Sequence, residues 1–160
     1  MAVLLSRKKL RNNFLDKSKK GVYLLILRLK KNKRISIGNR PKIKFRKGIY
    51  IYIGSAFGGF RGRINRHLRK NKKLFWHIDY LLQDAEIKEV WLKQGNHNEC
   101  QTAREMRNII KDPVYPFKKF GSSDCQCPSH LFYIPEGTSG LRDLREKLTF
   151  KKVLINGNQT

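Results

Sequence analysis

The chain has 160 residues, of which 36 are Lys or Arg and 12 are Asp or Glu, so its formal net charge is +24. That length suits one domain, and 39% hydrophobic residues are enough for one core, which excludes a tandem multidomain protein and a disordered basic tail. No apolar run reaches about 18 residues. The charges near the start follow an apolar patch, the reverse of a secretory signal. We therefore expect a soluble, intracellular protein without membrane association.

The charge is concentrated in the first half of the chain. Residues 1–73 hold 24 Lys and Arg and a single acid, Asp16, whereas residues 74–160 hold 12 basic and 11 acidic residues. Such an asymmetry creates a one-sided positive potential that attracts polyanions, of which nucleic acids are the commonest inside cells and anionic membrane surfaces the second. We expect a nucleic-acid partner and a cytoplasmic or nucleoid-associated location.

The first half contains two predicted strands and one predicted helix. Residues 21–29 form an apolar run typical of a buried strand, and residues 48–54 alternate strictly between Ile and Tyr. The basic connection between them, residues 30–47, is expected to be an extended excursion. After the Gly58-Gly59 break, apolar residues recur at helical spacing, with Arg63 and His67 one turn apart beside them. The stripe consists of Phe60, Ile64 and Leu68.

The second half alternates predicted helices and strands. Asn98 is a suitable N-cap for a helix that runs to about Ile110 and ends before Asp112-Pro113. The other expected elements are a short helix at 74–82, strands at 87–92 and 131–134, and a helix at 139–148. The order predicts an α/β domain of three or four strands with helices packed around them.

Tyr50 and Tyr52 lie on the face of their strand opposite the Ile residues. Tyrosines favour half-buried strand positions, which is the simple explanation for an isolated pair. Here the strand breaks at Gly54 and leads into a helix that carries Arg63 and His67. We therefore expect at least one of the two tyrosines to border a site, in an arrangement that can clamp a phosphate.

Glu99 falls on the apolar stripe of its predicted helix. The stripe continues through Ala103, Met106 and Ile110, so the carboxylate is expected to face inward. It is the best candidate ligand for a hard divalent ion such as Mg²⁺, with interaction at the helix N-terminus as the alternative. Glu86 and Glu89 are lesser candidates.

Three cysteines and a histidine offer four soft or borderline ligands. An odd number of cysteines in the C-terminal half does not indicate a disulfide framework. Zinc requires four such ligands, but the C-x-C spacing is less usual than C-x-x-C, and buried cysteines are often ordinary core residues. Zinc is thus a possible but not favoured interpretation of Cys100, Cys125, Cys127 and His130.

Several segments together resemble the GIY-YIG nuclease superfamily. They are Gly21-Val22-Tyr23, Tyr52-Ile53-Gly54-Ser55-Ala56, Arg63 with Arg66-His67, His77 and Glu99. The string from Gly48 to Gly54 contains both halves of the superfamily's name, but its two motifs lie on neighbouring strands, so the first is assigned to Gly21-Val22-Tyr23. With residues 76–80 and 121–130, the pattern looks like an archaeal and bacterial branch whose domain stands alone or is fused to endonuclease III.

The resemblance implies a fold, a cofactor and a set of catalytic roles. The fold is α/β (α+β), with a central three-stranded antiparallel sheet flanked by helices, and the reaction is Mg²⁺- or Mn²⁺-dependent hydrolysis of phosphodiester bonds by water. Tyr23 would be the general base or would orient the water, and Tyr52 would position the water or a phosphate oxygen. Arg63 would stabilise charge on the phosphate, and Glu99 would hold the metal. Two further catalytic candidates are His67, assisting Tyr23 or the leaving group, and His77, which has the alternative of a satisfied core histidine.

The expected organisation has three parts. Residues 1–19 form a basic arm, residues 20–135 the GIY-YIG-like domain, and residues 136–160 a C-terminal helix and tail that pack on it or trail it. The long gap between Tyr23 and Tyr52 makes residues 30–47 a basic insertion suited to nucleic-acid contact. The candidate nucleic-acid-binding residues are Lys42, Lys44, Arg46, Lys47, Arg61, Arg66, Arg69 and Lys70.

The expected function is an endonuclease, with DNA favoured over RNA. Structured or damaged DNA in repair and recombination is the preferred substrate, and family analogy suggests a link to a base-excision glycosylase. One alternative is a basic DNA- or RNA-binding module without cleavage, which predicts steep salt dependence and little sensitivity to Glu99. Another is a ribosomal or membrane-surface protein with no divalent-ion requirement.

Overall fold

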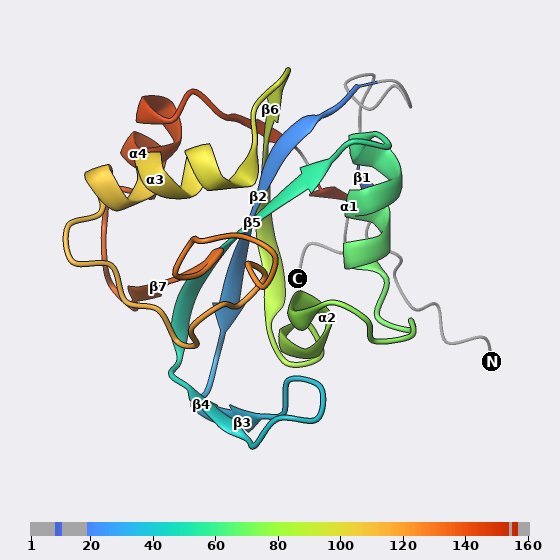
Figure 1. Cartoon of the computed structure of the whole chain (residues 1–160), viewed down its shortest axis with the longest axis vertical. Coiled ribbons are helices and arrows are strands. Elements are labelled where there is room, and N and C mark those ends of the chain that lie inside the picture. The colour runs from blue at the N-terminus through green and yellow to red at the C-terminus, as the bar shows by residue number, and fades with distance from the viewer. Residues whose placement is uncertain (1–8, 11–18, 154, 157–160) are drawn as a thin grey trace.

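The structure is a computed structural model that describes residues 9–10, 19–153 and 155–156 (Figure 1). The expected basic arm, residues 1–19, lies almost wholly outside the described residues. The strands are β1 (Lys9–Leu10), β2 (Gly21–Leu29), β3 (Lys33–Ile35), β4 (Ile43–Phe45), β5 (Gly48–Ala56), β6 (Glu86–Gln94), β7 (Leu131–Pro135), β8 (Lys151–Val153) and β9 (Ile155–Asn156). The helices are α1 (Phe60–Leu68), α2 (His77–Leu81), α3 (Glu99–Ile109) and α4 (Leu141–Lys147). In this part of the chain, none of the helices combines the length and apolar character needed to cross a bilayer.

The main sheet has five strands in the order β7-β5-β2-β6-β8, and all its pairings are antiparallel. This confirms a mixed α/β domain with a mostly antiparallel sheet, but the expectation of a three-stranded sheet is wrong. The three expected strands are its centre, β5, β2 and β6. Two short edge strands extend it because β7 pairs with β5 and the three residues of β8 pair with β6.

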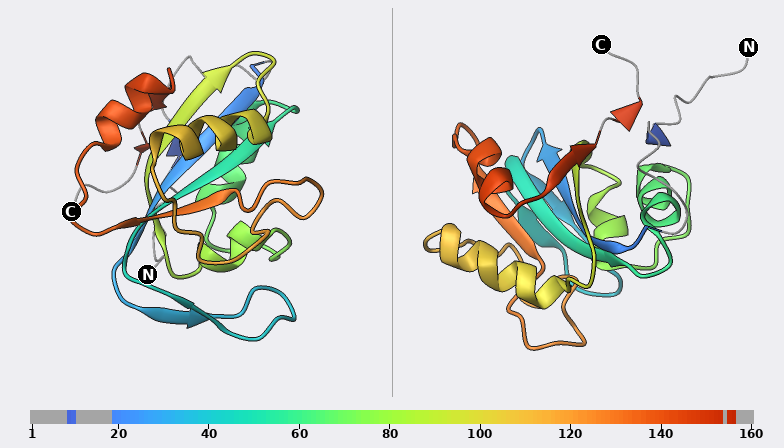
Figure 2. Two further views of the ribbon diagram at one scale, coloured as in Figure 1. Left: turned by 60° about the vertical axis from the view of Figure 1, so that its left-hand side comes forward. Right: turned by 90° about the horizontal axis from the view of Figure 1, so that it is seen from above.

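Helices cover both faces of the sheet, which explains the almost unbroken apolar sequence of β2. Alternate residues of β2, beginning with Tyr23 and Leu25, face a core shared with α1 and α2. The intervening residues, such as Val22 and Leu24, face a second core with α3 and α4. Figure 2 shows the sheet between these two helical layers. A strand buried on both sides needs no polar face, so periodicity of two disappears from its sequence.

The helices follow the predicted patterns closely. The stripe Phe60, Ile64 and Leu68 of α1 is buried, and α3 begins at the predicted cap, where Asn98 Oδ1 accepts a hydrogen bond from the Gln101 amide at 2.7 Å. Helix α2 is shorter than the expected 74–82. The last predicted helix is α4, and Leu144 is buried against the second core.

The basic insertion is a small hairpin that projects from the sheet. Strands β3 and β4 pair within residues 30–47 and form a separate two-stranded sheet beyond the end of β2 (Figure 1). Ile35 and Phe45 are buried, which anchors the hairpin to the first core, while its Lys and Arg side chains are exposed. The hairpin therefore presents positive charge on a fixed support.

Candidate active site

Five helices and strands of the fold contribute to one pocket of about 340 Å³. Tyr23 comes from β2, Tyr52 and Ser55 from β5, Arg63 from α1 and Glu99 from the first turn of α3. The other walls are the segment before and at the start of α2 and the loop before β7. Their lining residues are Phe75, Trp76, His77, Gly121, Ser123, Asp124, Cys125 and His130, and Cys100 of α3 also lines the pocket. The pocket thus joins five of the six residues expected in the catalytic and magnesium sites, and the sixth, His67, contacts it through Tyr23.

Tyr23 is held by a neighbour on each side. In the β2–β5 register it is paired with Gly54, and a Cβ atom at that glycine would overlap the Tyr23 ring. On the other side, the Tyr23 hydroxyl lies 2.6 Å from His67 Nε2 in a buried hydrogen bond. Glycine at position 54 therefore makes room for the ring, and the imidazole fixes the direction of the hydroxyl.

Both members of this pair are neutral at physiological pH. Burial raises the pKa of Tyr23 well above 10, and the neighbouring Tyr52 raises it further, whereas Arg63 opposes the rise. Burial, followed by the charge of Lys72, lowers the pKa of His67 to about 3. In the tautomer of His67 that carries its proton on Nδ1, Nε2 accepts the hydrogen bond from the Tyr23 hydroxyl. The resting site therefore contains a phenol and an imidazole, not a phenolate.

Tyr52 and Tyr50 have different surroundings although they share a face of β5. Tyr52 lines the pocket, and burial followed by the charge of Glu99 raises its pKa. Tyr50 does not line the pocket: it packs between Phe45 and Tyr133, and its hydroxyl donates to the Arg46 carbonyl at 2.5 Å. Of these two tyrosines, at least one of which is expected beside a site, Tyr52 borders this pocket, while Tyr50 belongs to the core.

Arg63 and Arg66 sit on the ring of Trp76, but only Arg63 also lines the pocket. Their guanidinium carbons lie 4.3 and 4.0 Å from the indole centroid. Arg66 additionally makes two hydrogen bonds, of 2.7 and 2.8 Å, to the fully buried Asp79. That carboxylate also accepts the backbone amides of Phe75 and Trp76 at 2.9 Å. Arg66, expected to bind nucleic acid, is therefore engaged in an internal ion pair.

Glu99 is a partly exposed carboxylate with two close neighbours. Ser55 Oγ donates to Oε1 at 2.6 Å, and His130 Nδ1 lies 3.0 Å from Oε2. Burial raises the pKa of Glu99, but these contacts outweigh it and leave the pKa lowered, so the group is ionised at neutral pH. Each oxygen retains a lone pair. An ionised carboxylate at an open pocket, with hydroxyls beside it, fits Mg²⁺, which binds through one or two carboxylates and otherwise keeps water and phosphate ligands.

His77 shapes the wall of the pocket. Its Nδ1 accepts a hydrogen bond from the Gly121 amide at 3.0 Å, and burial lowers its pKa, so it is a neutral imidazole that carries its proton on Nε2. Gly121 has a φ of +69°, and a Cβ atom there would press on the Tyr52 ring at 3.0 Å. His77 therefore ties the loop before β7 to α2 beside Tyr52.

The four residues considered as possible zinc ligands lie together. One ligand atom from each of Cys100, Cys125, Cys127 and His130 lies within 4.8 Å of the others, so the group could hold a metal ion. The adjacency of Glu99 and Cys100 in the sequence already makes the magnesium and zinc candidates neighbours. The sequence did not reveal that Ser55, Phe75 and Trp76 line the pocket. The nearest sign of these two aromatic residues in the sequence is Asp79, which stands three residues after Trp76, where an acid can cap a short helix.

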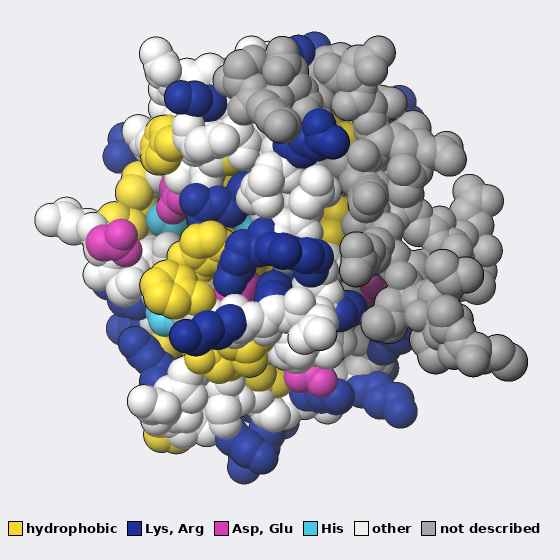
Figure 3. Space-filling model, turned by 90° about the vertical axis from the view of Figure 1, so that its right-hand side faces the viewer, with side chains coloured by type: hydrophobic (Ala, Val, Ile, Leu, Met, Phe, Trp, Pro, Cys, Tyr) yellow, Lys and Arg dark blue, Asp and Glu magenta, His cyan; other side chains and the backbone are white. Residues whose placement is uncertain are grey.

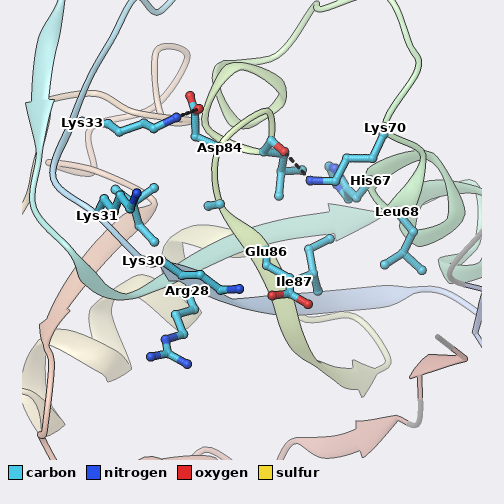
Figure 4. A pocket seen from close by; sticks show the side chains of 13 residues that line it. Arg28, Lys30, Lys31, Lys33, His67, Leu68, Lys70, Asp84, Glu86 and Ile87 are labelled. Carbon is cyan, nitrogen blue, oxygen red and sulfur yellow. Dashed lines mark hydrogen bonds and ion pairs between the residues drawn. The ribbon is translucent and has the colours of Figure 1, made fainter. Parts of the chain in front are cut away.

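A second cavity, of about 530 Å³, lies at the end of β2 and beginning of β6 (Figure 4). Its rim carries Arg28, Lys30, Lys31, Lys33 and Lys70; Lys33 pairs with Asp84, and Lys70 donates to the Leu82 carbonyl at 3.0 Å. His67 lines this cavity and also bonds to Tyr23, so its ring lies between the two cavities.

The expected nucleic-acid-binding residues form two groups. One is on the β3–β4 hairpin and the turn that follows it, with Lys42, Lys44, Arg46 and Lys47 all exposed. The other is on and just after α1, where Arg61, Arg69 and Lys70 are exposed and Arg66 is not. On the face that includes α1 and α2, Lys and Arg side chains surround a patch of hydrophobic ones (Figure 3).

Fold and site together define a mixed α/β domain with a pocket of two tyrosines, an arginine and a carboxylate. The chain belongs to the family described as "Domain of unknown function DUF123", whose model matches residues 22–152. No curated protein and no solved structure matches the sequence. The matched region runs from β2 into β8 and contains every residue of the pocket.

Proposed function

We propose that this protein is a metal-dependent endonuclease of the GIY-YIG type. The observation that carries the proposal is the convergence of Tyr23, Tyr52, Arg63 and Glu99, from four different elements, on one pocket. The pocket offers a phenol that is hydrogen-bonded to a buried neutral imidazole, together with a cation and an ionised carboxylate. These groups can activate water, bind a phosphate and hold a divalent ion.

Tyr23 and His67 act on the attacking water. The Tyr23 oxygen accepts a hydrogen bond from the water while its own proton points at His67 Nε2, 2.6 Å away. As the water attacks phosphorus, its proton passes to Tyr23 and the tyrosine proton passes to His67. Burial opposes a charged His67 in the resting site. A bound phosphate supplies the negative charge that favours the imidazolium and makes this transfer accessible.

Arg63 and Glu99 act on the phosphate. The Arg63 guanidinium lies on Trp76 and can offer its planar set of donors to two phosphate oxygens as negative charge builds up on them. Glu99, oriented by Ser55 and His130, would hold Mg²⁺ or Mn²⁺, and the ion would polarise the phosphate and stabilise the leaving oxygen. Tyr52 borders the same space and positions the water or a phosphate oxygen.

The substrate is a nucleic acid, with DNA favoured over RNA. The exposed basic residues of the β3–β4 hairpin and of α1 supply phosphate contacts on two sides of the domain. Phe75, which is 74% exposed and lines the pocket, offers a surface on which an unpaired base can stack. These features favour structured or damaged DNA with unpaired bases near the scissile bond.

A cleavage assay with matched tyrosine variants tests the proposal. Labelled single-stranded, duplex, flap and branched DNAs and a structured RNA are incubated with Mg²⁺, with Mn²⁺ or with a chelator. We expect metal-dependent cleavage that Tyr23→Phe and Glu99→Gln abolish and that Arg63→Ala lowers by about 10²-fold or more. Tyr50→Phe is the control, because it removes a hydroxyl from the same sheet face outside the pocket and should leave cleavage intact.

Binding measured on the same panel separates the alternatives. If wild-type protein binds nucleic acid tightly but cuts none of the substrates with either metal, the catalytic proposal fails and the protein is a binding module. Equal loss of cleavage in Tyr50→Phe and Tyr23→Phe would contradict the assignment of the first motif to Tyr23.

A further inference from the structure

The group Cys100, Cys125, Cys127 and His130 brings together two distant parts of the chain. Cys100 is in the first turn of α3, and the other three lie in the loop that leads into β7. Cys127 and His130 are buried, and Cys100 and Cys125 are partly buried. All three thiols are free rather than joined in a disulfide. The fold therefore gathers the three cysteines of the chain and one imidazole at a single point.

Their spacing matches one tetrahedral ion. With zinc–sulfur and zinc–nitrogen bonds of about 2.3 and 2.0 Å, tetrahedral geometry sets ligand atoms about 3.5–3.8 Å apart. Cys125 Sγ lies 3.7 Å from His130 Nε2, and no two of the four ligand atoms are more than 4.8 Å apart. Ligands of an iron–sulfur cluster bind different iron atoms and so stand farther apart. A small adjustment of side chains would close the group around one ion.

The close packing of these ligand atoms favours a cation. All four lie within 4.8 Å of one another, and thiolates that close repel one another. A divalent cation removes that repulsion and binds the deprotonated sulfurs directly. Three thiolates and one zinc ion carry a net charge of about −1, and Lys119 lies nearby, with its Nζ donating to the Cys125 carbonyl at 2.5 Å.

We propose that Cys100, Cys125, Cys127 and His130 form a closed structural zinc site. Four protein ligands leave no open position for water or substrate, so the ion would not take part in hydrolysis. It would instead fasten the start of α3 to the loop that supplies Gly121, Ser123 and Asp124 to the pocket. Zinc binding at this site does not depend on the nuclease proposal.

His130 links this zinc site to Glu99. Its Nε2 faces Cys125, while its Nδ1 lies 3.0 Å from Glu99 Oε2. The ring is buried, and its backbone is fixed by hydrogen bonds from its amide to the Phe120 carbonyl, at 2.8 Å, and from the Ile53 amide to its carbonyl, at 2.9 Å. A histidine that binds zinc through one nitrogen commonly presents the other N–H to a carboxylate. Zinc would thus make His130 a positioning residue for Glu99, a role that rests on the proposed function of Glu99.

Metal analysis of the full-length protein tests the proposal directly. Protein made in zinc-supplemented medium and purified with reductant but no chelator is analysed for zinc and iron by mass spectrometry. We expect about one zinc per chain. Cobalt exchanged for the zinc should give the visible bands and the sulfur-to-metal charge transfer of tetrahedral thiolate coordination. The Cys127→Ser variant should lose both the bound zinc and the cobalt spectrum. The His97→Asn variant, which changes a partly buried histidine outside the group, should retain both.

Each result either supports or overturns the zinc site. A folded wild-type chain with no stoichiometric zinc and no cobalt charge-transfer band overturns it, as does iron in place of zinc or full zinc retention by Cys127→Ser. Because the zinc content of the wild-type protein decides whether the site exists, a variant that fails to fold does not leave that question open. Protein that binds zinc but cleaves nothing would refute the nuclease proposal alone, and cleavage by zinc-free protein would refute the zinc site alone.

Discussion

Replacing Asp79 with Asn removes a charge on which one wall of the candidate site depends. Asp79 is fully buried, and its carboxylate accepts hydrogen bonds from Arg66 and from the amides of Phe75 and Trp76. Asn has the same shape and keeps one acceptor oxygen, but it leaves the Arg66 guanidinium without its counter-charge. The substitution should therefore loosen the turn that holds Trp76 against Arg63.

The size of the effect follows from the pKa of Asp79. Burial raises this pKa, but the Arg66 contacts and the two amides outweigh burial and lower it from 3.8 to about 2. Because one pKa unit corresponds to about 1.4 kcal/mol, the ionised carboxylate contributes about 2 kcal/mol to the free energy of unfolding. A carboxyl with a lowered pKa contributes this stability above its unfolded-state value of 3.8 and loses it as the pH falls through about 2.

Urea denaturation of wild type and Asp79→Asn over a range of pH measures this contribution. At neutral pH the variant should be less stable by about 2 kcal/mol, and the difference should close between about pH 4 and pH 2. Asp84→Asn is the control: its partner Lys33, at 2.5 Å, is half exposed, so the loss should stay below about 1 kcal/mol. A difference that stays constant down to about pH 2 would show that packing, not the charge of Asp79, causes the loss.

Three further predictions concern the pocket and the basic surface. Gly54→Ala should leave binding intact but lower cleavage by about 10²-fold, because the new methyl displaces the Tyr23 ring. Phe75→Ala should leave the unfolding free energy unchanged and weaken single-stranded DNA binding by about 1–3 kcal/mol in a fluorescence titration, since a stacking surface is lost. Lys44→Ala and Arg69→Ala should each weaken binding equally for all sequences and reduce the slope of log affinity against log salt by about 1.

Matched controls accompany each of these predictions. Gly58→Ala adds a methyl in the turn just after β5, where nothing lies within 4 Å of it, so it should leave cleavage unchanged. Phe57→Ala removes a ring that is 67% exposed but does not line the pocket, and it should not alter single-stranded binding. Equal effects of Gly58→Ala and Gly54→Ala, or of Phe57→Ala and Phe75→Ala, would contradict the steric and stacking arguments. If Lys44→Ala leaves the slope of log affinity against log salt unchanged, the hairpin is not part of the nucleic-acid interface.

The sequence predicted the long elements well because their own patterns define them. Local sequence alone is enough to recognise the apolar run of β2, the Ile and Tyr alternation of β5 and the apolar stripe of α1. The same holds for the Asn98 cap of α3. Strand β8 was missed because Lys151-Lys152-Val153 has no strand pattern of its own. Its pairing with β6 comes from tertiary contact. The expected three-stranded sheet came instead from the family resemblance, which leaves out both edge strands, β7 and β8.

The candidate site was predicted in its residues but not in its connections. Tyr23, Tyr52, Arg63 and Glu99 were named from spacing and resemblance, and their pocket is formed by sheet register and helix position. That His130 faces both Cys125 and Glu99 depends on the path of the loop before β7. Nor could a pattern show that Arg66 pairs with Asp79, because the two residues are 13 positions apart and meet only through the packing of α1 against α2.

The stacking of Arg63 and Arg66 on Trp76 gives the protein an intrinsic fluorescent reporter. The chain has two tryptophans, and Trp91 is buried in the second core, away from the pocket. In a Trp91→Phe background, emission would come from Trp76 alone. A polyanion that draws Arg63 off the indole changes the polarity beside the fluorophore, while Arg66 remains fixed by Asp79. Occupancy of the pocket can thus be followed in real time without a label on either molecule.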